Sequence, residues 1–276
     1  MNTAGKLLAT TGAMGGCGGA YFVAKPLLSP DKQITTADFN KKGVWKAIFL
    51  THKEDANFKS TFSLTGSEAV DTASVSIRDK CKQLVKDNSK DLIEKWCVVP
   101  TPKTIEARLY LDEKELASDD DDRQNLFVLY KEDEGFINAI KGDGSGFTKN
   151  SNKSDAKTKI ETYCSSKMSV SAEDPSYSNI KNWCTKPPRD VKAKLVEDGI
   201  VLIGESDTAG WADKYEKLKG ESAFLTAIGV STGSAVDKAE GGPKLKTWCT
   251  TEYSKKLHDN DVYPTNFELS KTRCSK

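Results

Sequence analysis

The sequence has almost no net charge and very little histidine, and both shortages exclude classes of function. Its 41 Lys and Arg are balanced by 40 Asp and Glu, which leaves a formal net charge of +1 over 276 residues. No overall field therefore exists to attract nucleic acid or an anionic bilayer. Only two histidines occur and no Cys-x-x-Cys pair is present, so a zinc site is not expected.

The usual motifs of catalysis and ligand binding are also missing. A cysteine nucleophile needs a positioned base, but His52 and His258 occupy unrelated places in the chain. The glycine-rich stretch 142–146 follows no strand pattern and precedes no Gly-Lys-Ser or Gly-Lys-Thr, so we interpret it as a flexible loop. The run Asp119–Asp122 lacks the glycine and the final glutamate of a calcium loop. We therefore expect a protein that is not an enzyme, with no catalytic residue, metal, cofactor or small-molecule substrate.

Hydrophobic residues are scarce as well, at 37% of the chain against 29% charged residues. This share is below that of most globular domains and predicts small cores with much solvated surface. One large, well-filled core is not expected from this composition. The length suits two or three small domains instead.

One uncharged stretch, residues 7–24, lies between Lys6 and Lys25 near the N-terminus. As a helix rising about 1.5 Å per residue it would nearly cross a hydrocarbon core, and membrane spans tolerate its glycines. We predict a retained membrane-spanning anchor within an N-terminal segment of residues 1–39. Three alternatives stay open: a cleaved signal peptide, a lipoprotein signal with Cys17 as the candidate lipidation site, and a glycine-rich leader on a cytosolic protein.

The other six cysteines form three successive pairs, which indicate an internal repeat. An aliphatic residue stands four positions before the first cysteine of each pair, one helical turn away on the same face. Disulfides within small modules would stabilise each by about 3 kcal/mol; buried reduced thiols are the alternative. The predicted pairs, each with its preceding aliphatic residue, are Cys81 and Cys97 (Ile77), Cys164 and Cys184 (Ile160), and Cys249 and Cys274 (Leu245).

The residues around the second cysteine of each pair also repeat. Trp96 and Trp183 directly precede Cys97 and Cys184, whereas the third copy has Arg273 before Cys274. In copies one and two, prolines follow the cysteine and then a helical pattern, which predicts a helix with Pro102 or Pro188 in its first turn. We interpret Trp96, Trp183, Trp211 and Trp248 as core residues.

These patterns predict a mainly α protein in which the N-terminal segment is followed by three degenerate modules of three or four short helices. We place the modules at residues 40–118, 119–205 and 206–276. Aromatic amphipathic stretches open them near Trp45, Phe127 and Trp211. The stretches 142–146 and 241–242 are expected to be loops at similar places, and Asp119–Asp122 a solvated boundary between two copies.

The motifs that carry the repeat resemble a known group of sequences. The glycine-rich N-terminal stretch, the segment from Trp96 to Pro100 with the helical pattern after it, and the Trp183-Cys184-Thr185 block leading to Trp211 are similar to the large paralogous families of uncharacterised proteins in hemotropic mycoplasmas. Arg273 and the Lys186-Pro187-Pro188 sequence depart from that pattern. The resemblance implies a wall-less bacterium living on red cells, with surface-displayed, antigenically variable paralogues and no established activity.

The function expected from the sequence is that of a membrane-anchored, non-catalytic interaction or antigen protein. It would be displayed on the extracellular face of the cell membrane and bind an unknown protein or host-cell surface component. The alternative is a soluble or cytosol-facing helical binding module whose cysteines are reduced. The redox state of the six paired cysteines separates the two.

Overall fold

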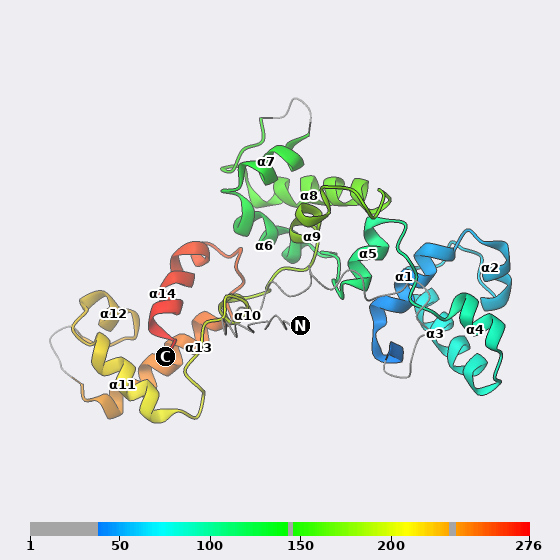
Figure 1. Cartoon of the computed structure of the whole chain (residues 1–276). Helices are drawn as coiled ribbons and strands as arrows, with labels where there is room; N and C mark the ends of the chain where they lie inside the picture. The colour runs from blue at the N-terminus through cyan, green and yellow to red at the C-terminus, as the bar shows by residue number, and fades with distance from the viewer. Residues whose placement is uncertain (1–37, 143–145, 232–235) are drawn as a thin grey trace, which may run out of the picture. The chain divides into compact units, whose positions relative to one another are not determined.

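The computed structural model describes residues 38–142, 146–231 and 236–276 (Figure 1). These residues fall into two compact units, which meet between residues 101 and 102 of the chain. The described residues are mainly α-helical and contain only isolated β-bridges in place of strands, so the predicted fold class is confirmed at this level. Each unit is described by itself.

Unit 1 contains one set of four helices, called module 1 here. A short 3-10 helix, η1 (Asp38–Asn40), precedes α1 (Lys42–His52), α2 (Ala56–Phe62), α3 (Val70–Lys86) and α4 (Lys90–Trp96). The long helix α3 contacts each of the other three. It is therefore the element around which the module is built.

Unit 2 repeats this helix order twice, each time after a short linker helix. The linker helices are α5 (Ile105–Leu111) and α10 (Val191–Glu197). Module 2 consists of α6 (Asp120–Tyr130), α7 (Glu134–Lys141), α8 (Lys153–Met168) and α9 (Tyr177–Trp183). Module 3 consists of α11 (Thr208–Leu218), α12 (Ser222–Ala227), α13 (Lys238–Tyr253) and, after the π-helical turn η2 (Val262–Asn266), α14 (Phe267–Arg273).

A buried phenylalanine holds the second helix of every module. Phe58, Phe136 and Phe224 are each the third residue of their helix and are fully buried. Asp55 and Asp133 begin the first two of these helices, where each carboxylate accepts two backbone N–H groups. One turn after the phenylalanine a second apolar side chain is also buried: Phe62, Ile140 and Ile228 in the three modules.

The third helix of each module carries a small residue, an aliphatic residue and a cysteine at four-residue spacing. This spacing places all three on one helical face, which packs against the first helix of the module. The predicted Ile or Leu before each cysteine is buried. The three sets are Ala73, Ile77 and Cys81; Ala156, Ile160 and Cys164; and Gly241, Leu245 and Cys249.

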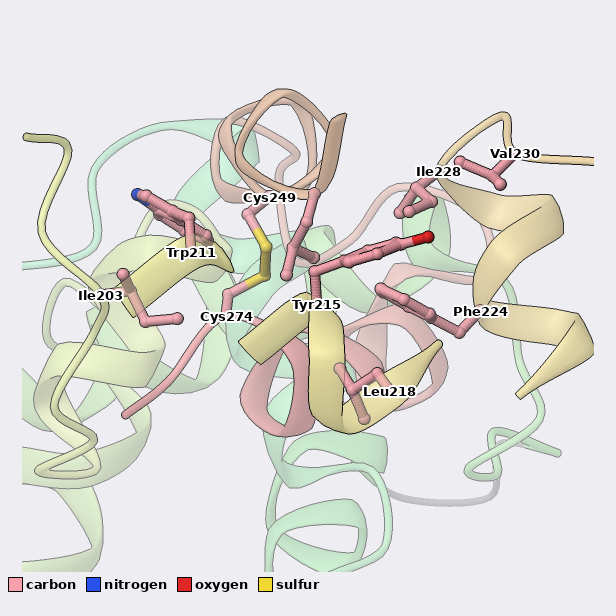
Figure 2. Packing of buried hydrophobic residues seen from close by; sticks show 10 residues of the cluster. Ile203, Trp211, Tyr215, Leu218, Phe224, Ile228, Val230, Cys249 and Cys274 are labelled. Carbon is pink, nitrogen blue, oxygen red and sulfur yellow. A yellow bond between two sulfur atoms is a disulfide. The ribbon is translucent and has the colours of Figure 1, made fainter. Parts of the chain in front are cut away.

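Gly241 and Gly242 lie inside α13, so the predicted loop at these residues is wrong. A Cβ atom at Gly241 would overlap the ring of Tyr215, whose hydroxyl donates a hydrogen bond to the Val236 carbonyl at 3.3 Å. Figure 2 shows this ring among the buried side chains of module 3. In modules 1 and 2 a phenylalanine, Phe49 or Phe127, occupies the position of Tyr215 and alanine that of Gly241. The glycine is therefore a packing residue that makes room for a larger ring.

Replacing Gly241 by alanine is expected to lower the free energy of unfolding by about 2 kcal/mol, because the core is overfilled. The double variant Gly241→Ala with Tyr215→Phe should recover most of this loss, since the freed ring can withdraw as in the other modules. Denaturant unfolding of the single and double variants measures the coupling. Additive losses would contradict this account of Gly241.

The two linker helices begin at side-chain caps rather than at prolines. Thr104 Oγ1 accepts the Ala107 N–H at 3.3 Å, and Asp190 Oδ1 accepts the Ala193 N–H at 2.8 Å. The prediction that Pro102 and Pro188 occupy the first turn is wrong, because each lies two residues before its cap. A threonine or aspartate side chain satisfies a free backbone N–H, which proline cannot do.

Hydrogen bonds tie each linker helix to the module that follows it. Before α5, the Ile105 N–H donates to the Val170 carbonyl at 2.9 Å, and after α5 the Ala117 N–H donates to the Cys184 carbonyl at 3.0 Å. The corresponding bonds around α10, Val191 to Lys255 and Ile203 to Cys274, measure 3.1 and 3.0 Å. The predicted boundaries after residues 118 and 205 assign each linker helix to the module that precedes it. The hydrogen bonds instead group each helix with the module that follows.

Both linker helices end at a residue in the left-handed conformation, Glu113 (φ 57°) and Gly199 (φ 75°). Only glycine adopts this conformation without a steric penalty. We expect Glu113→Gly to raise the free energy of unfolding by about 1 kcal/mol and Gly199→Ala to lower it by about 1 kcal/mol. Chemical denaturation measures both, and shifts of the same sign would show that backbone strain does not decide the effect.

Candidate functional site

A disulfide closes every module at the same place. It joins the third helix to the residue that follows the fourth helix, with Cα–Cα distances of 5.8 Å for Cys81–Cys97, 5.5 Å for Cys164–Cys184 and 5.8 Å for Cys249–Cys274. This geometry fits the three predicted pairs. The bonds close loops with sequence separations of 16, 20 and 25 residues, which corresponds to about 3 kcal/mol of stabilisation each.

The residue before the second cysteine packs against the buried phenylalanine of its module. The rings of Trp96 and Trp183 meet Phe58 and Phe136 edge-on, with centroids 5.3 and 5.6 Å apart. Both tryptophans are buried, as is Trp211, which confirms the predicted core role of these three; Trp248 is only partly buried. In modules 1 and 2 the disulfide therefore joins the end of the fourth helix to the third helix, and the aromatic pair joins it to the second.

In module 3 a buried arginine, Arg273, takes the place of the tryptophan. The Arg273 guanidinium lies 5.5 Å from the Phe224 ring and 5.1 Å from the Trp248 ring, and the side chain is 6% exposed. Burial lowers the pKa of Arg273, while the carboxylates of Glu221 and Glu252 act in the opposite direction. Stacking on two rings replaces the edge-on tryptophan as the contact to the core.

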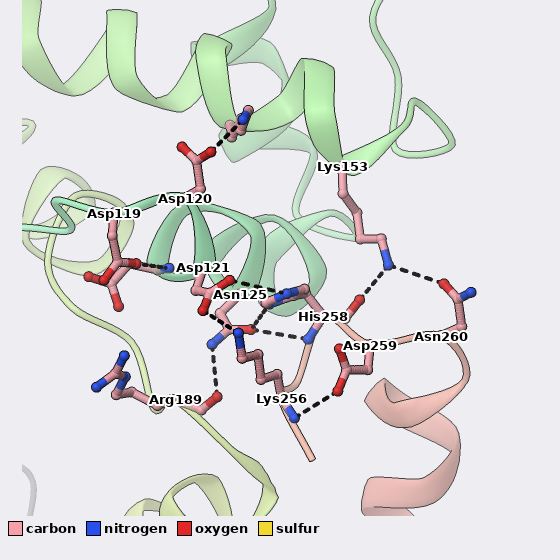
Figure 3. A network of polar contacts seen from close by, with 12 residues as sticks. Asp119, Asp120, Asp121, Asn125, Lys153, Arg189, Lys256, His258, Asp259 and Asn260 are labelled. Atoms are coloured by element: carbon pink, nitrogen blue, oxygen red, sulfur yellow. Dashed lines mark hydrogen bonds and ion pairs between the residues drawn. The ribbon is translucent and has the colours of Figure 1, made fainter. Parts of the chain in front are cut away.

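Modules 2 and 3 meet at a buried asparagine, Asn125 on α6, which is 1% exposed (Figure 3). Its Nδ2 donates to the carbonyls of Pro188 and Arg189 at 3.2 and 3.1 Å. Its Oδ1 accepts the backbone N–H of His258 at 3.0 Å and lies 2.8 Å from His258 Nδ1. One side chain thus connects module 2, the segment before α10 and the loop between α13 and α14. We call this arrangement the joint.

The contacts of Asn125 fix the protonation of His258. Both amide hydrogens of Asn125 point to carbonyl oxygens, so Oδ1 must accept and His258 Nδ1 must carry a proton. The other ring nitrogen, Nε2, lies 3.6 Å from Asp121 Oδ1. Burial lowers the pKa of His258, although the carboxylates of Asp121 and Asp259 oppose the shift. The neutral imidazole, with its proton on Nδ1, is therefore the form that fits these contacts.

Ion pairs and an apolar cluster surround these polar contacts. Lys256 Nζ lies 2.5 Å from Asp121 Oδ2, and Lys153 on α8 donates to the His258 carbonyl and, at 3.3 Å, to Asn260 Oδ1. Next to them lies an apolar cluster contributed by both modules and the linker helix. Its buried members are Val128, Val191, Leu195, Leu257, Val262 and Phe267.

The acidic run at the start of α6 is part of this arrangement: Asp119 and Asp120 are exposed as predicted, but the prediction of a solvated boundary is wrong for Asp122. Asp119 caps the helix by accepting the Asp122 N–H at 2.8 Å, and Asp122 itself is 1% exposed. Burial raises the pKa of Asp122. A hydrogen bond from Lys256 lowers the pKa of Asp121. Carboxylates are favoured at a helix N-terminus, and here that terminus lies at a contact between modules.

A hollow beside the joint is lined by four lysines, three of which pair with carboxylates. Its wall includes Lys114, Lys181, Lys186 and Lys194 together with Tyr130 and Tyr263. The Nζ–O distances are 2.7 Å for Lys181 and Asp112, 2.8 Å for Lys186 and Glu115, and 2.5 Å for Lys194 and Asp198. These three ion pairs weaken the attraction of the hollow for an anion.

The predicted anchor, residues 7–24, and the candidate lipidation site Cys17 lie outside the described residues. Among the residues that the structure describes, no helix combines the length and the apolar character needed to cross a bilayer. Within the same ranges, no group of three or more His, Cys, Asp or Glu side chains is arranged to hold a metal ion.

Sequence reasoning missed two features of the modules. The first is the repeated phenylalanine, which a visible signal marks: Lys53-Glu54-Asp55 and Lys131-Glu132-Asp133 each stand just before it, and Lys219-Gly220-Glu221 is a weaker copy. The second is Asn125, whose equivalents in modules 1 and 3 are Ala47 and Asp213. Nothing in the repeat marks the asparagine, because it belongs to a contact between modules.

No family model, curated protein or solved structure matches the chain. The similarity to hemotropic mycoplasma families therefore rests on the sequence motifs alone.

Asn125→Ala should lower the free energy of unfolding of the chain by about 3 kcal/mol, because it removes the partner of the buried His258 N–H and of the Pro188 and Arg189 carbonyls. Asn138→Ala is the matched control, since this exposed asparagine contacts only Lys141 through its side chain. Denaturant unfolding with both variants tests the difference. Equal small losses would mean that the joint does not depend on Asn125.

Proposed function

We propose that the chain is a non-enzymatic, membrane-anchored surface protein in which three tandem helical modules present variable loops to a protein or other component of a host-cell surface. Residues 7–24 would hold it in the cell membrane, with Cys17 as a candidate lipid attachment site. The mycoplasma-like motifs support a wall-less bacterium as its source. An antigenically variable scaffold would need this combination of a constant core and a changeable exterior.

The disulfides are the observation that carries the proposal. All six cysteines after Cys17 are paired, one bond in each module, and each bond closes a core of few hydrophobic residues. Disulfides persist in oxidising surroundings and are rare where thiols are kept reduced. A thin core that depends on such a bond supports display outside the cytoplasm.

The distribution of repeated positions supports binding rather than a shared chemistry. The positions that agree between modules are buried, such as Phe58, Phe136 and Phe224. Two residues after these phenylalanines the exposed residues differ between modules: Ser60, Asn138 and Thr226. Retained core positions with free exterior positions are what a scaffold for variable recognition requires.

Limited proteolysis of intact cells, followed by mass spectrometry, tests the display. We expect peptides from residues 38–276 to be released, while a cytosolic protein of the same cells stays uncleaved. Full protection of the chain until the cells are lysed would contradict display.

The thiol state tests the compartment independently. Cells quenched with an alkylating reagent should give three linked peptide pairs under non-reducing conditions: Cys81 with Cys97, Cys164 with Cys184, and Cys249 with Cys274. Six alkylated cysteines would instead favour the alternative, a soluble or cytosol-facing binding module with reduced thiols.

A further inference from the structure

We propose that the joint between modules 2 and 3 is an acid-sensitive hinge: it is closed while His258 is neutral and opens in mild acid, with both modules still folded. This inference goes beyond surface display and does not rest on it. It depends only on contacts within residues 102–276, which form one compact unit.

The first step is that the hydrogen bonds of the closed joint use only one imidazole proton. The amide of Asn125 is anchored by the carbonyls of Pro188 and Arg189, and its oxygen takes both the backbone N–H and the Nδ1–H of His258 (Figure 3). A second proton would sit on Nε2. The Oδ1 atom of Asp121, 3.6 Å from that nitrogen, is too far for a hydrogen bond in the closed geometry.

The second step is the charge that faces the ring. Module 2 contributes Asp121 from α6 and Lys153 from α8, and the loop of His258 itself contributes Lys256 and Asp259. Arg189, in the segment before α10, acts on Asp121. Two cations and two carboxylates therefore already surround the imidazole. Asp121 already forms an ion pair with Lys256. A positive charge on the His258 ring would therefore compete with Lys256 for this carboxylate.

The sign of the effect follows from linkage. Burial, opposed by Asp121 and Asp259, lowers the pKa of His258 in the closed joint below its ordinary value of 6.5. The open joint then binds the proton more tightly than the closed one. The stabilisation is fully present above about pH 6.5 and is lost as the pH falls below that value towards the lower pKa of the closed state.

The third step is that opening the joint does not require unfolding of a module. Module 2 has its own core around Phe136 and Ile160, and module 3 has one around Tyr215 and Phe224. Each is closed by its own disulfide. His258 belongs to neither core. Its loop adjoins the separate cluster shared by α6, α10 and the start of α14, which is the part that acid would release.

Hydrogen exchange of the full chain at pH 7.5 and 5.5, corrected for the intrinsic rate, measures the opening. Backbone amides at residues 189–191 and 254–262 should exchange up to about tenfold faster at pH 5.5, the limit set by an ordinary histidine pKa in the open state. Amides near Phe136 and Leu245 should keep their protection. Equal protection of the joint at both pH values, or its tightening in acid, would overturn the proposal.

Two variants separate titration from a merely structural role. His258→Asn keeps a donor near the position of Nδ1 but cannot titrate, so its joint should exchange equally at both pH values. Asp121→Asn removes a carboxylate that favours the charged ring and should increase the ratio between the two pH values. His52→Asn, outside unit 2, is the control and should leave that ratio unchanged.

A nuclear magnetic resonance titration of the two histidines keeps the test valid even where a variant misfolds. The full wild-type chain should show the His258 ring titrating below pH 6.5, with the other histidine assigned by the His52→Asn variant. A His258 pKa at or above 6.5 would refute the hinge, because the closed joint would then bind the proton at least as well as the open one.

Discussion

The structure depends on one covalent constraint, the disulfide that fastens the end of the fourth helix to the third helix in every module. A chain with 37% hydrophobic residues has little apolar surface to bury, and each fourth helix is only seven residues long. Helices of that length are marginal by themselves. The sulfur bridge holds such a helix over the buried phenylalanine, so that Trp96, Trp183 or Arg273 can complete the core.

Between modules the chain uses polar contacts instead of a covalent bond. Asn125 satisfies four hydrogen-bonding groups at once, and the apolar cluster beside it draws on both modules and on α10. On α11 the positions equivalent to Asn125, Val128 and Leu129 are exposed and charged: Asp213, Glu216 and Lys217. Module 2 therefore has a face suited to receive a neighbour, and the equivalent face of module 3 is solvated.

Local patterns in the sequence were good guides to the interior of a module. The four-residue spacing of Ile77 and Cys81, and the tryptophan before the second cysteine, both correspond to buried faces. The same reasoning was wrong for Gly241, because a glycine pair normally indicates a turn. Here the glycine lies in a helix, where the ring of Tyr215 occupies the space of a side chain. It was also wrong for Asp122, whose burial depends on the fold around α6.

The sequence by itself determined the helical class, the cysteine spacing and the apolar faces, because all of these follow from the fixed period of the α-helix along a single segment. Only the tertiary structure decided that Asn125 and His258 meet, that the linker helices bond to the modules that follow them, and that a glycine lies inside α13. Each of these depends on segments far apart in the chain, and no local periodicity specifies which of them will touch.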